Sequence, residues 1–460
     1  MKKLIVAAIF IAMGNTSFSQ SLGYQDLALL FSQNQQQGTA RFNAMGGAFG
    51  ALGGDLSAIA INPAGLSIFN KSIFSGTLNS RRTDISSVYY GNGITTQEEF
   101  INLSQGGAVL VFDSSYTSDW NKFALGFNYR ITNDFDANWL ASGNSGVATF
   151  TEFPLDNGNP PNQYDVAENQ FFNNRYNGEL SELSIGLSAV HQNKFYLGLG
   201  LNFVDLNFVQ QSALTEQNRD SNGNTLDADL YQENYTTGVG FGANLGFIYK
   251  AHKNFRFGFS YQTPTWFSEI IEESNIVNND GYFGDTQITV SNDNIIYDNT
   301  FGGNLPVQNL LYRLRTPGQI TASAALIIGK FGLISVDYSN RYFRNMRLTN
   351  DNFAAENQFF QNELQNTNNL NVGAELRFDR FSIRGGYRYA ESPDKLAIES
   401  DHFKSYSVGA GYNFGTFKLD FSYSDSNQTS VYNFYPGFNV NAADLSIDNK
   451  IFTGTVTINL

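Results

Sequence analysis

The sequence predicts an all-β protein: a closed, antiparallel transmembrane β-barrel of fourteen strands with an N-terminal hatch inside the lumen. Three observations support this fold class: a charge-poor aromatic composition, a period of two along most of the chain, and alternating short and long connections. Charged residues make up 15% of the 460 residues, against about 25% in an ordinary soluble domain. The 41 Phe, 24 Tyr and 43 Gly residues indicate β structure.

The composition also excludes several functional classes. The chain has no cysteine, which excludes a disulfide framework, a thiolate metal site and a cysteine nucleophile. Its formal net charge of -14 argues against nucleic acid as a partner, because phosphate binding needs a basic surface.

The first nineteen residues predict a signal peptide. Lys2 and Lys3 precede an apolar run over residues 4–13, and Ser17-Phe18-Ser19 supplies the small-x-small ending. The run is too short for a membrane helix, which needs about 20 apolar residues. We expect cleavage after Ser19 and export of the mature chain.

From about residue 70 onward, apolar and polar residues alternate. Phe381, Ile383 and Tyr387 fall on one face of a strand, and Arg384 and Arg388 fall on the other. The apolar face should meet lipid, since turning this strand over would place both arginines in hydrocarbon at a cost of about 4–8 kcal/mol.

Fourteen segments have a strand pattern, and short turns join alternate pairs. The segments lie near 70–80, 106–113, 122–132, 180–192, 194–209, 235–250, 254–272, 313–329, 331–346, 368–379, 381–391, 402–414, 417–426 and 449–460. Short turns are expected at 191–194, 251–254, 329–330, 379–380 and 415–416, and long polar loops at 133–179, 210–234, 273–312 and 427–448. This alternation is typical of an outer-membrane barrel with tight periplasmic turns and longer outer loops.

Residues 20–69 lack the alternation of apolar and polar residues, so they form a segment distinct from the strands that follow. Small residues and glycines dominate 40–66, so this segment is poor at crossing lipid and well suited to filling a cavity. The lumen of a fourteen-stranded barrel must be occluded by something if the barrel is not an open pore. We therefore divide the chain into a signal peptide (1–19), a hatch or plug segment (20–69) and a barrel (70–460).

The same segment resembles the FadL/TodX family of outer-membrane transporters of long-chain fatty acids and other hydrophobic compounds. The resemblance is carried by Arg41, by Met45-Gly46-Gly47-Ala48-Phe49, by Asp55-Leu56-Ser57-Ala58 and by Asn62-Pro63-Ala64-Gly65-Leu66. Residues 257–264, 371–378 and 383–389 are similar to later strands of the family.

The resemblance implies a function and a location. It implies passive uptake of long-chain fatty acids or similar hydrophobic compounds by a monomeric barrel in the outer membrane of a Gram-negative bacterium. The hatch residues would be Gly46, Gly47, Asn62, Pro63 and Ala64. Ligand would leave sideways through an opening near residues 122–132, without energy coupling or a cofactor.

A ligand carboxylate would need a cation in the lumen. Alternation turns Lys122, Arg130, Arg256, Arg377, Arg384, Arg388 and Lys418 inward. Most of these should pair with lumen acids such as Glu375, Asp379 and Asp420. We select Arg384, Arg388 and Arg256 as carboxylate candidates.

The histidine content bears on whether the barrel is an enzyme. The three histidines, His191, His252 and His402, form no recognisable Ser-His-acid arrangement, so an enzyme is not expected and neither is a metal site. A scaffold or shuttle barrel of a protein-secretion system and a nonspecific pore stay open as alternatives. Trp120, Trp139 and Trp266 are expected in the interfacial girdle.

Overall fold

The structure is a computed structural model of the whole chain. It describes residues 22–113, 119–151, 158–278, 288–291, 294–299, 303–304, 307–435 and 438–460 except residues 34 and 36, and its side chains outside 275–309. The predicted signal peptide lies outside these residues, as does much of the predicted loop at 273–312.

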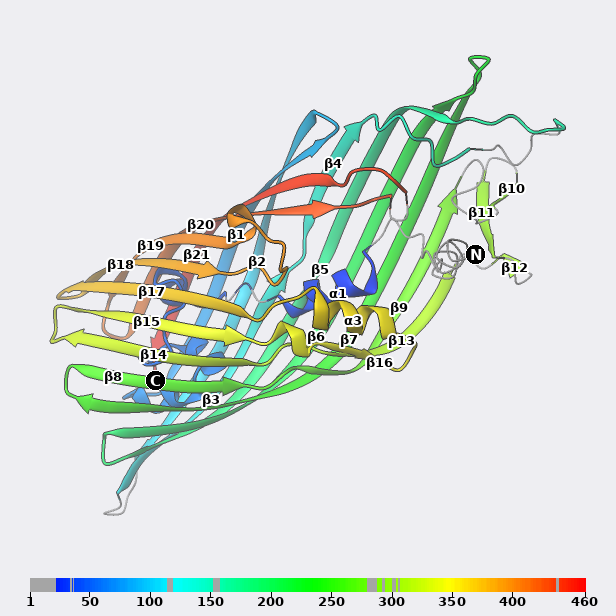
Figure 1. Cartoon of the computed structure of the whole chain (residues 1–460). Coiled ribbons are helices and arrows are strands. Elements are labelled where there is room, and N and C mark those ends of the chain that lie inside the picture. Colours follow the sequence, from blue (N-terminus) through cyan, green and yellow to red (C-terminus); the bar gives the residue numbers. More distant parts are fainter. Residues whose placement is uncertain are drawn as a thin grey trace, which may run out of the picture.

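The strands form one closed antiparallel ring (Figure 1). The ring closes where β21 pairs with β1, with Ile73 opposite Asn459. Counted around the ring there are fourteen wall strands, which confirms the predicted number. Three wall strands are interrupted and carry two labels each: β8 with β9, β13 with β14, and β15 with β16. The strand bounds are β1 Ile73–Tyr89, β2 Asn92–Asp113, β3 Trp120–Asp134, β4 Ala137–Gly143, β5 Val166–His191, β6 Phe195–Arg219, β7 Thr225–His252, β8 Phe255–Gln262, β9 Trp266–Asn278, β10 Ile288–Ser291, β11 Asn294–Asn299, β12 Gly303–Asn304, β13 Val307–Arg315, β14 Gln319–Ile328, β15 Gly332–Arg341, β16 Arg347–Thr349, β17 Thr367–Phe378, β18 Phe381–Ala390, β19 Phe403–Asn413, β20 Phe417–Tyr432 and β21 Ala443–Asn459.

The five predicted short turns are confirmed, and all lie at one end of the barrel, which we name the turn end. They join β5 to β6, β7 to β8, β14 to β15, β17 to β18 and β19 to β20. Gln192, Asn193, Asp379 and Gly415 take the positive φ that such tight reversals require.

At the opposite end of the barrel, which we name the extended end, the strands on one side are much longer than those on the other. β5, β6 and β7 have 26, 25 and 28 residues, whereas β17, β18 and β19 have 12, 10 and 11. A bilayer needs about 9–11 residues per strand, so the three long strands continue well beyond the lipid. The predicted loop at 210–234 is therefore wrong: it is the far part of a hairpin that turns at 220–224. The predicted loop at 133–179 likewise contains β4 and the first half of β5.

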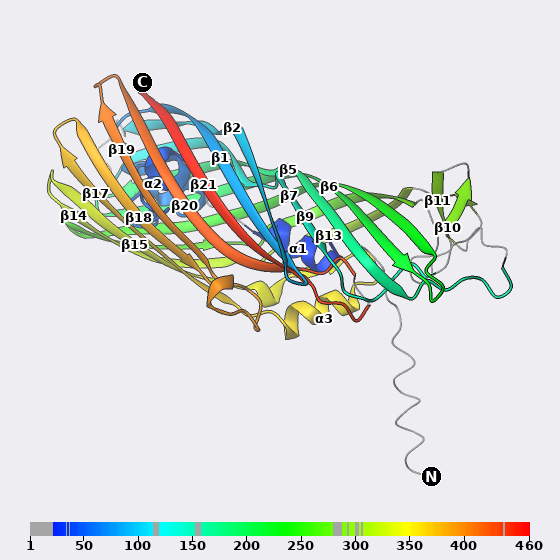
Figure 2. The same cartoon turned by 90° about the horizontal axis from the view of Figure 1, so that it is seen from above.

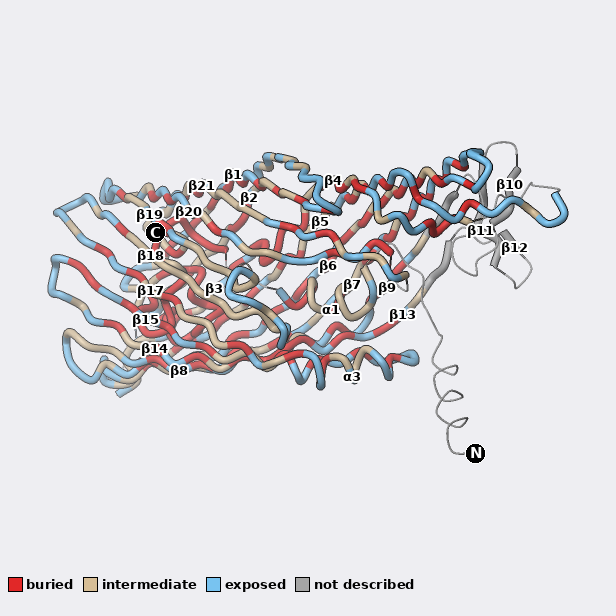
Figure 3. The backbone as a smooth tube through the Cα atoms, turned by 45° about the horizontal axis from the view of Figure 1, so that its top comes forward, coloured by how far each residue is buried: buried red, intermediate tan, exposed pale blue. Residues whose placement is uncertain are grey.

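The outer face of the barrel carries the apolar belt. On β8, Phe257 and Phe259 are 47% and 40% exposed, and on β18 Ile383 is 47% exposed whereas Arg384 is 6% exposed. The predicted orientation of residues 381–391 is therefore confirmed. Figure 3 shows the resulting alternation of buried and exposed positions along the strands.

An aromatic cluster fills the inside of the long-strand side at the extended end. Trp139 packs edge-on against Tyr432 and is 2% exposed, so its predicted place in the girdle is wrong, whereas Trp266 is 43% exposed. Glu216 is buried beside this cluster. Its carboxylate accepts from the backbone N–H groups of Thr149 and Phe150 at 2.7 and 3.0 Å. It also accepts from the side chains of Thr149, Gln170, Asn218 and Tyr435.

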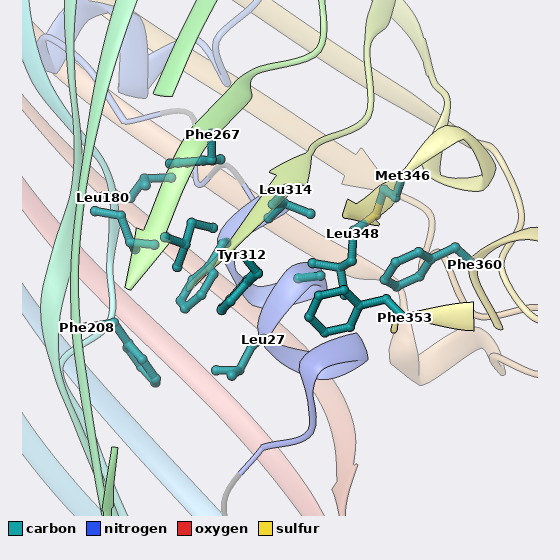
Figure 4. Close-up of a cluster of buried hydrophobic side chains, with 14 of the residues drawn as sticks. Leu27, Leu180, Phe208, Phe267, Tyr312, Leu314, Met346, Leu348, Phe353 and Phe360 are labelled. Atoms are coloured by element: carbon teal, nitrogen blue, oxygen red, sulfur yellow. The ribbon is translucent and has the colours of Figure 1, made fainter. Parts of the chain in front are cut away.

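A second apolar cluster surrounds the helix α1 (Tyr24–Ser32) within the ring (Figure 4). Leu27 and Phe31 are each 1% exposed, and Phe31 meets Phe208 of β6 edge-on at 5.5 Å between ring centroids. On the other side, Tyr24 meets Tyr312 of β13 and Phe353, which precedes the helix α3 (Ala354–Asn362). Two 3-10 turns, η3 (Phe343–Asn345) and η4 (Glu399–Asp401), lie at strand ends.

Among the described residues, no helix combines the length and the apolar character needed to cross a bilayer.

Candidate functional site

The N-terminal segment folds into short capped turns inside the ring (Figure 2). It contains α2 (Ala40–Ala44) and the 3-10 turns η1 (Leu56–Ala60) and η2 (Pro63–Ile68). Thr39, Asp55 and Asn62 cap them by accepting from backbone N–H groups two or three residues later. No residue from 37 to 69 is exposed. Each short turn is therefore started by its own sequence and held by the surrounding wall.

Asp55 also ties the segment together internally. The Thr39 hydroxyl donates to both Asp55 carboxylate oxygens, at 2.9 and 2.8 Å. Burial raises the pKa of the Asp55 carboxyl, and the Arg41 guanidinium and hydrogen bonds from Thr39 and Ser57 oppose that shift.

Glycines on the inner face of the wall contact the N-terminal segment, and we name this set of positions the glycine seat. At six inward-facing wall glycines, the atom nearest to an added Cβ would be an atom of residues 44–64, at less than 3.0 Å. These six are Gly198, Gly246, Gly258, Gly373, Gly386 and Gly409, on β6, β7, β8, β17, β18 and β19. At Gly198, Gly258, Gly373 and Gly386 the backbone of the segment therefore lies directly against the backbone of the wall, as only glycine allows.

Polar groups of the wall satisfy the backbone of the segment around the ring. Arg256 donates to the carbonyl oxygen of Leu52 at 2.9 Å, and Ser407 donates to that of Ala44 at 3.1 Å. Ser188 donates to the carbonyl oxygen of Ala64 at 3.1 Å. Further bonds join Gly50 N–H to Asp337, and Asn62 Nδ2 to the carbonyl oxygens of Gly50 and Phe247. Because buried backbone groups need partners, these bonds hold the segment in place.

One ion-pair network joins the segment to the wall. Arg41 Nε lies 2.9 Å from Glu375 Oε2, and Arg384 Nε lies 2.7 Å from the same oxygen. Arg384 Nη1 lies 2.6 Å from Asp420 Oδ1, and Arg377 Nη2 lies 2.5 Å from Glu375 Oε1. The predicted pairing of lumen cations with Glu375 and Asp420 is thus confirmed for Arg384, whose charge is already offset.

A cavity of about 550 Å³ lies between this segment and the extended end. Its size is typical of sites for small ligands. Its polar lining includes Arg81, Arg130, Arg341 and Arg388, and its apolar lining includes Leu29, Phe343, Phe359 and Leu364. Gly46 and Gly47 also border it, with φ of 59° and 74°. In the part of the chain that the structure describes, no group of three or more His, Asp or Glu side chains could hold a metal ion.

No protein-family model matches the sequence, and no curated relative matches it at a significant level. Solved structures do match. A FadL homologue of Pseudomonas aeruginosa aligns with a TM-score of 0.59 and 16% identity, over 92% of this chain and 98% of that one. The P. putida toluene transporter TodX aligns with a TM-score of 0.55 and 14% identity, over 92% and 99% of the two chains. The monoaromatic hydrocarbon channel CymD gives 0.54 and 13%, over 92% and 97%.

The chain has the FadL/TodX fold. The predicted structural resemblance is therefore confirmed. A FadL-type barrel with this apolar belt is a protein of the Gram-negative outer membrane. At these identities the likeness establishes the fold, and the ligand has to be argued from this chain.

The wall of this FadL-type barrel has a seam beside β3. β2 pairs with β3 only from Gln105 opposite Arg130 to Asp113 opposite Lys122, whereas residues 92–104 of β2 pair with β1 alone. Side chains bridge the seam instead: Asn102 donates to Asp134 at 2.8 Å and Thr96 donates to the Asn138 carbonyl oxygen at 2.7 Å. Ile101 beside the seam is 81% exposed. The continuous ladder of the barrel is therefore interrupted here.

The predicted site residues lie in two regions of the lumen, one at the N-terminal segment and the other along the cavity. Asn62, Pro63 and Ala64 lie at the glycine seat, Arg256 bonds the segment at Leu52, and Arg384 lies in the ion-pair network. Among the three carboxylate candidates, Arg388 alone lines the cavity. Sequence reasoning did not select Arg341, which shares that cavity and directly precedes the break between β15 and β16. Its position at a strand end hides it from an argument based on alternation.

Proposed function

We propose that this barrel passes hydrophobic compounds, including long-chain fatty acids, inward across the outer membrane without energy coupling. In this proposal residues 20–69 are a hatch, and ligand moves from the cavity toward the seam beside β3 when the hatch shifts. The observation that carries the proposal is the glycine seat. The lumen is filled by a segment of the same chain that contacts the wall through backbone groups, polar groups and small apolar clusters, and that pairs with no wall strand, so it can leave without unfolding a strand.

The solved neighbours support the ligand class. TodX is a toluene transporter, CymD is a monoaromatic hydrocarbon channel, and a third neighbour is a FadL homologue. In this chain the cavity adds arginines to an apolar lining, which suits a molecule with an acidic head and an apolar tail. We propose fatty acids on that ground, with the protein acting as a monomer and without a cofactor.

An engineered disulfide tests the hatch. Ser67 Oγ on η2 lies 2.5 Å from Ser188 Oγ on β5, so S67C/S188C should form a bond between hatch and wall. Because the natural chain has no cysteine, the new bond is the sole possible disulfide. We expect oxidised S67C/S188C to lose uptake of labelled oleate and toluene, and reductant to restore it.

A matched control is available within the wall. Ser86 Oγ and Thr95 Oγ1 lie 2.8 Å apart on paired positions of β1 and β2, away from the hatch, so S86C/T95C should leave uptake unchanged. Uptake at the wild-type rate through the oxidised S67C/S188C protein would refute the hatch. No uptake of either compound by the assembled wild-type barrel would refute transport and favour the secretion-scaffold alternative. Entry of a small sugar at a comparable rate would favour the pore.

A further inference from the structure

The loop between β18 and β19 carries two exposed apolar side chains. This loop, residues 391–402, which we name the rim loop, has Leu396 and Ile398 at its tip. Leu396 is 83% exposed, more than any other large apolar side chain in the described part of the chain, and Ile398 is 66% exposed. A single apolar side chain in water needs no explanation, but a pair beside the apolar belt indicates a surface that is covered.

The rim loop begins where the lipid ends. β18 and β19 have 10 and 11 residues, and one crossing of a bilayer needs about 9–11. At their ends Tyr389 pairs with Lys404, and both side chains lie on the outer face because the intervening Arg388 lines the cavity. Tyrosine and lysine are typical of the boundary between lipid and water. These strand ends therefore lie at the outer surface of the bilayer.

Contacts of the rim loop place its tip on the lipid side of the wall. Glu399, next to Ile398, has its Oε1 atom 2.6 Å from Nζ of Lys404. His402 packs edge-on against Tyr389, with 5.7 Å between ring centroids. Figure 2 shows the loop, in orange, projecting sideways beyond the ends of β18 and β19. The other side of the same loop lines the cavity through Glu391, Ser392, Pro393, Asp394 and Asp401.

Hydrogen bonds fix the rim loop on both sides of its tip. The Lys395 N–H donates to the carbonyl oxygen of Glu363 at 3.1 Å, and the Gln365 N–H donates to that of Pro393 at 2.8 Å. On the other side, Asp401 accepts from the hydroxyl of Thr429 on β20. The two apolar side chains are therefore presented at a defined place on the rim.

We propose that Leu396 and Ile398 insert into the outer leaflet and attach the short-strand side of the extended end to the membrane. The occupant of this surface is lipid, because the tip continues the outer-face belt of β19. On that strand Val408 and Tyr406 are 60% and 66% exposed, and Lys404 follows them at the edge. Apolar side chains that enter the boundary between headgroups and acyl chains leave water and stabilise the attached position. This inference concerns how the barrel sits in the membrane and does not depend on transport.

Spin labels on single cysteines test the insertion. Because the natural chain has no cysteine, L396C and I398C each carry one label, in vesicles of phosphatidylcholine. The measurement is the ratio of collisions with oxygen, which concentrates in lipid, to collisions with a water-soluble nickel chelate. We expect both labels to give ratios close to that of V408C in the belt. T225C, an exposed position beside the hairpin tip at 220–224, supplies the reference for water.

A second set of variants tests the native side chains. Ser400 is exposed beside the tip, so a label on S400C leaves Leu396 and Ile398 in place. In L396N/I398N/S400C we expect the oxygen-to-nickel ratio to fall several-fold toward the T225C value. V431N/S400C is the matched control, because Val431 is 68% exposed but lines the cavity, and its ratio should equal that of S400C.

Three results would overturn the proposal. L396C and I398C labels with the ratio of T225C would show that the tip lies in water. Labels shielded from both reagents would show that protein covers the tip, as in an assembly of barrels. An S400C ratio that does not respond to L396N/I398N would show that these two side chains do not hold the loop at the lipid. The heat-dependent gel shift of the folded barrel establishes for each variant that the labelled protein is assembled.

Discussion

Arg41 of the N-terminal segment and Glu375 of the wall form an ion pair, with Nε and Oε2 2.9 Å apart. Glu375 is 2% exposed and also meets two wall arginines, so the pair lies in a desolvated network. It is the direct charged link between the segment that fills the lumen and the strands around it.

Removing this link should loosen the hatch. Glu375 keeps its two wall arginines when Arg41 is replaced, so the wall stays intact and the N-terminal segment alone loses its ion pair. We expect R41Q to admit small solutes that wild type excludes, with a several-fold rise in conductance in planar bilayers. R82Q, which removes an exposed pair with Asp84 on the outer face, should not change conductance. An R41Q barrel as tight as wild type would show that the pair does not hold the hatch.

The glycine seat should not tolerate a methyl group. In G246A the new Cβ would meet Asn62, and in G198A it would meet the backbone of Pro63 and Ala64. Since backbone atoms cannot rotate away, we expect G198A to displace the hatch and raise conductance. G76A is the control, because nothing lies within 4 Å of a Cβ at Gly76. Equal conductance of G198A and G76A would contradict the seat.

Docking of α1 should depend on pH through Asp26. Burial raises the pKa of the Asp26 carboxyl to about 6, so the docked helix favours the neutral acid. The stabilisation is complete below pH about 3.8 and is lost as the pH rises through about 6, for a change of about 3 kcal/mol at most.

Hydrogen exchange measures this dependence. After correction for intrinsic rates, amides of residues 24–32 should be better protected at pH 5 than at pH 7.5. D26N should remove the difference and keep protection high at both values. Equal protection of wild type at the two pH values would rule out Asp26 as the group responsible.

Glu216 should hold the tall side of the extended end together. E216A leaves six hydrogen bonds without their acceptor, including those from Thr149, Phe150 and Tyr435. We expect residues 144–151 and 433–435 to become protease-sensitive on intact cells, while the heat-dependent gel shift of the folded barrel persists. E216Q, which keeps one acceptor oxygen, should be intermediate. Resistance of E216A to protease would show that the aromatic cluster alone suffices.

Local features, such as the alternation along a strand and the short turns, could be predicted from the sequence. Pairings between residues far apart in the sequence could not. Alternation placed Ile383 outward and Arg384 inward, and short turns fixed the strand number. The predicted segment for β6 ended too early, at 209, and that for β7 began too late, at 235, because outside the lipid Thr215 and Asp229 pair on the outer face and the apolar contrast fades. The seam beside β3 depends on which strand meets residues 92–104, which no local pattern specifies.

The site was predicted in part for the same reason. Gly198, Gly246 and Gly258 already stood on the polar face of their strands, and that spacing was a readable sign of a close backbone neighbour. Arg384 was placed on the correct face, but its two acidic partners come from β17 and β20. Whether an arginine in the cavity has an acid beside it depends on which distant strands come together when the ring closes. The sequence pattern of a single strand does not show this.

The glycine seat also has a consequence for the speed of passage. A plug whose side chains interlock with its socket must rotate many of them before it can move, and each rotation adds to the barrier. Here the wall has glycine at six of its contacts with the N-terminal segment, so no wall side chain at these positions has to rotate when the segment moves. At these positions the barrier is then set by hydrogen bonds and, among the described residues, one ion pair, while side chains such as Leu56, Ile59 and Leu66 still pack on β2 and β3. An evolving population can tune the leak and the flux of this barrel by changing those few polar groups without repacking its interior.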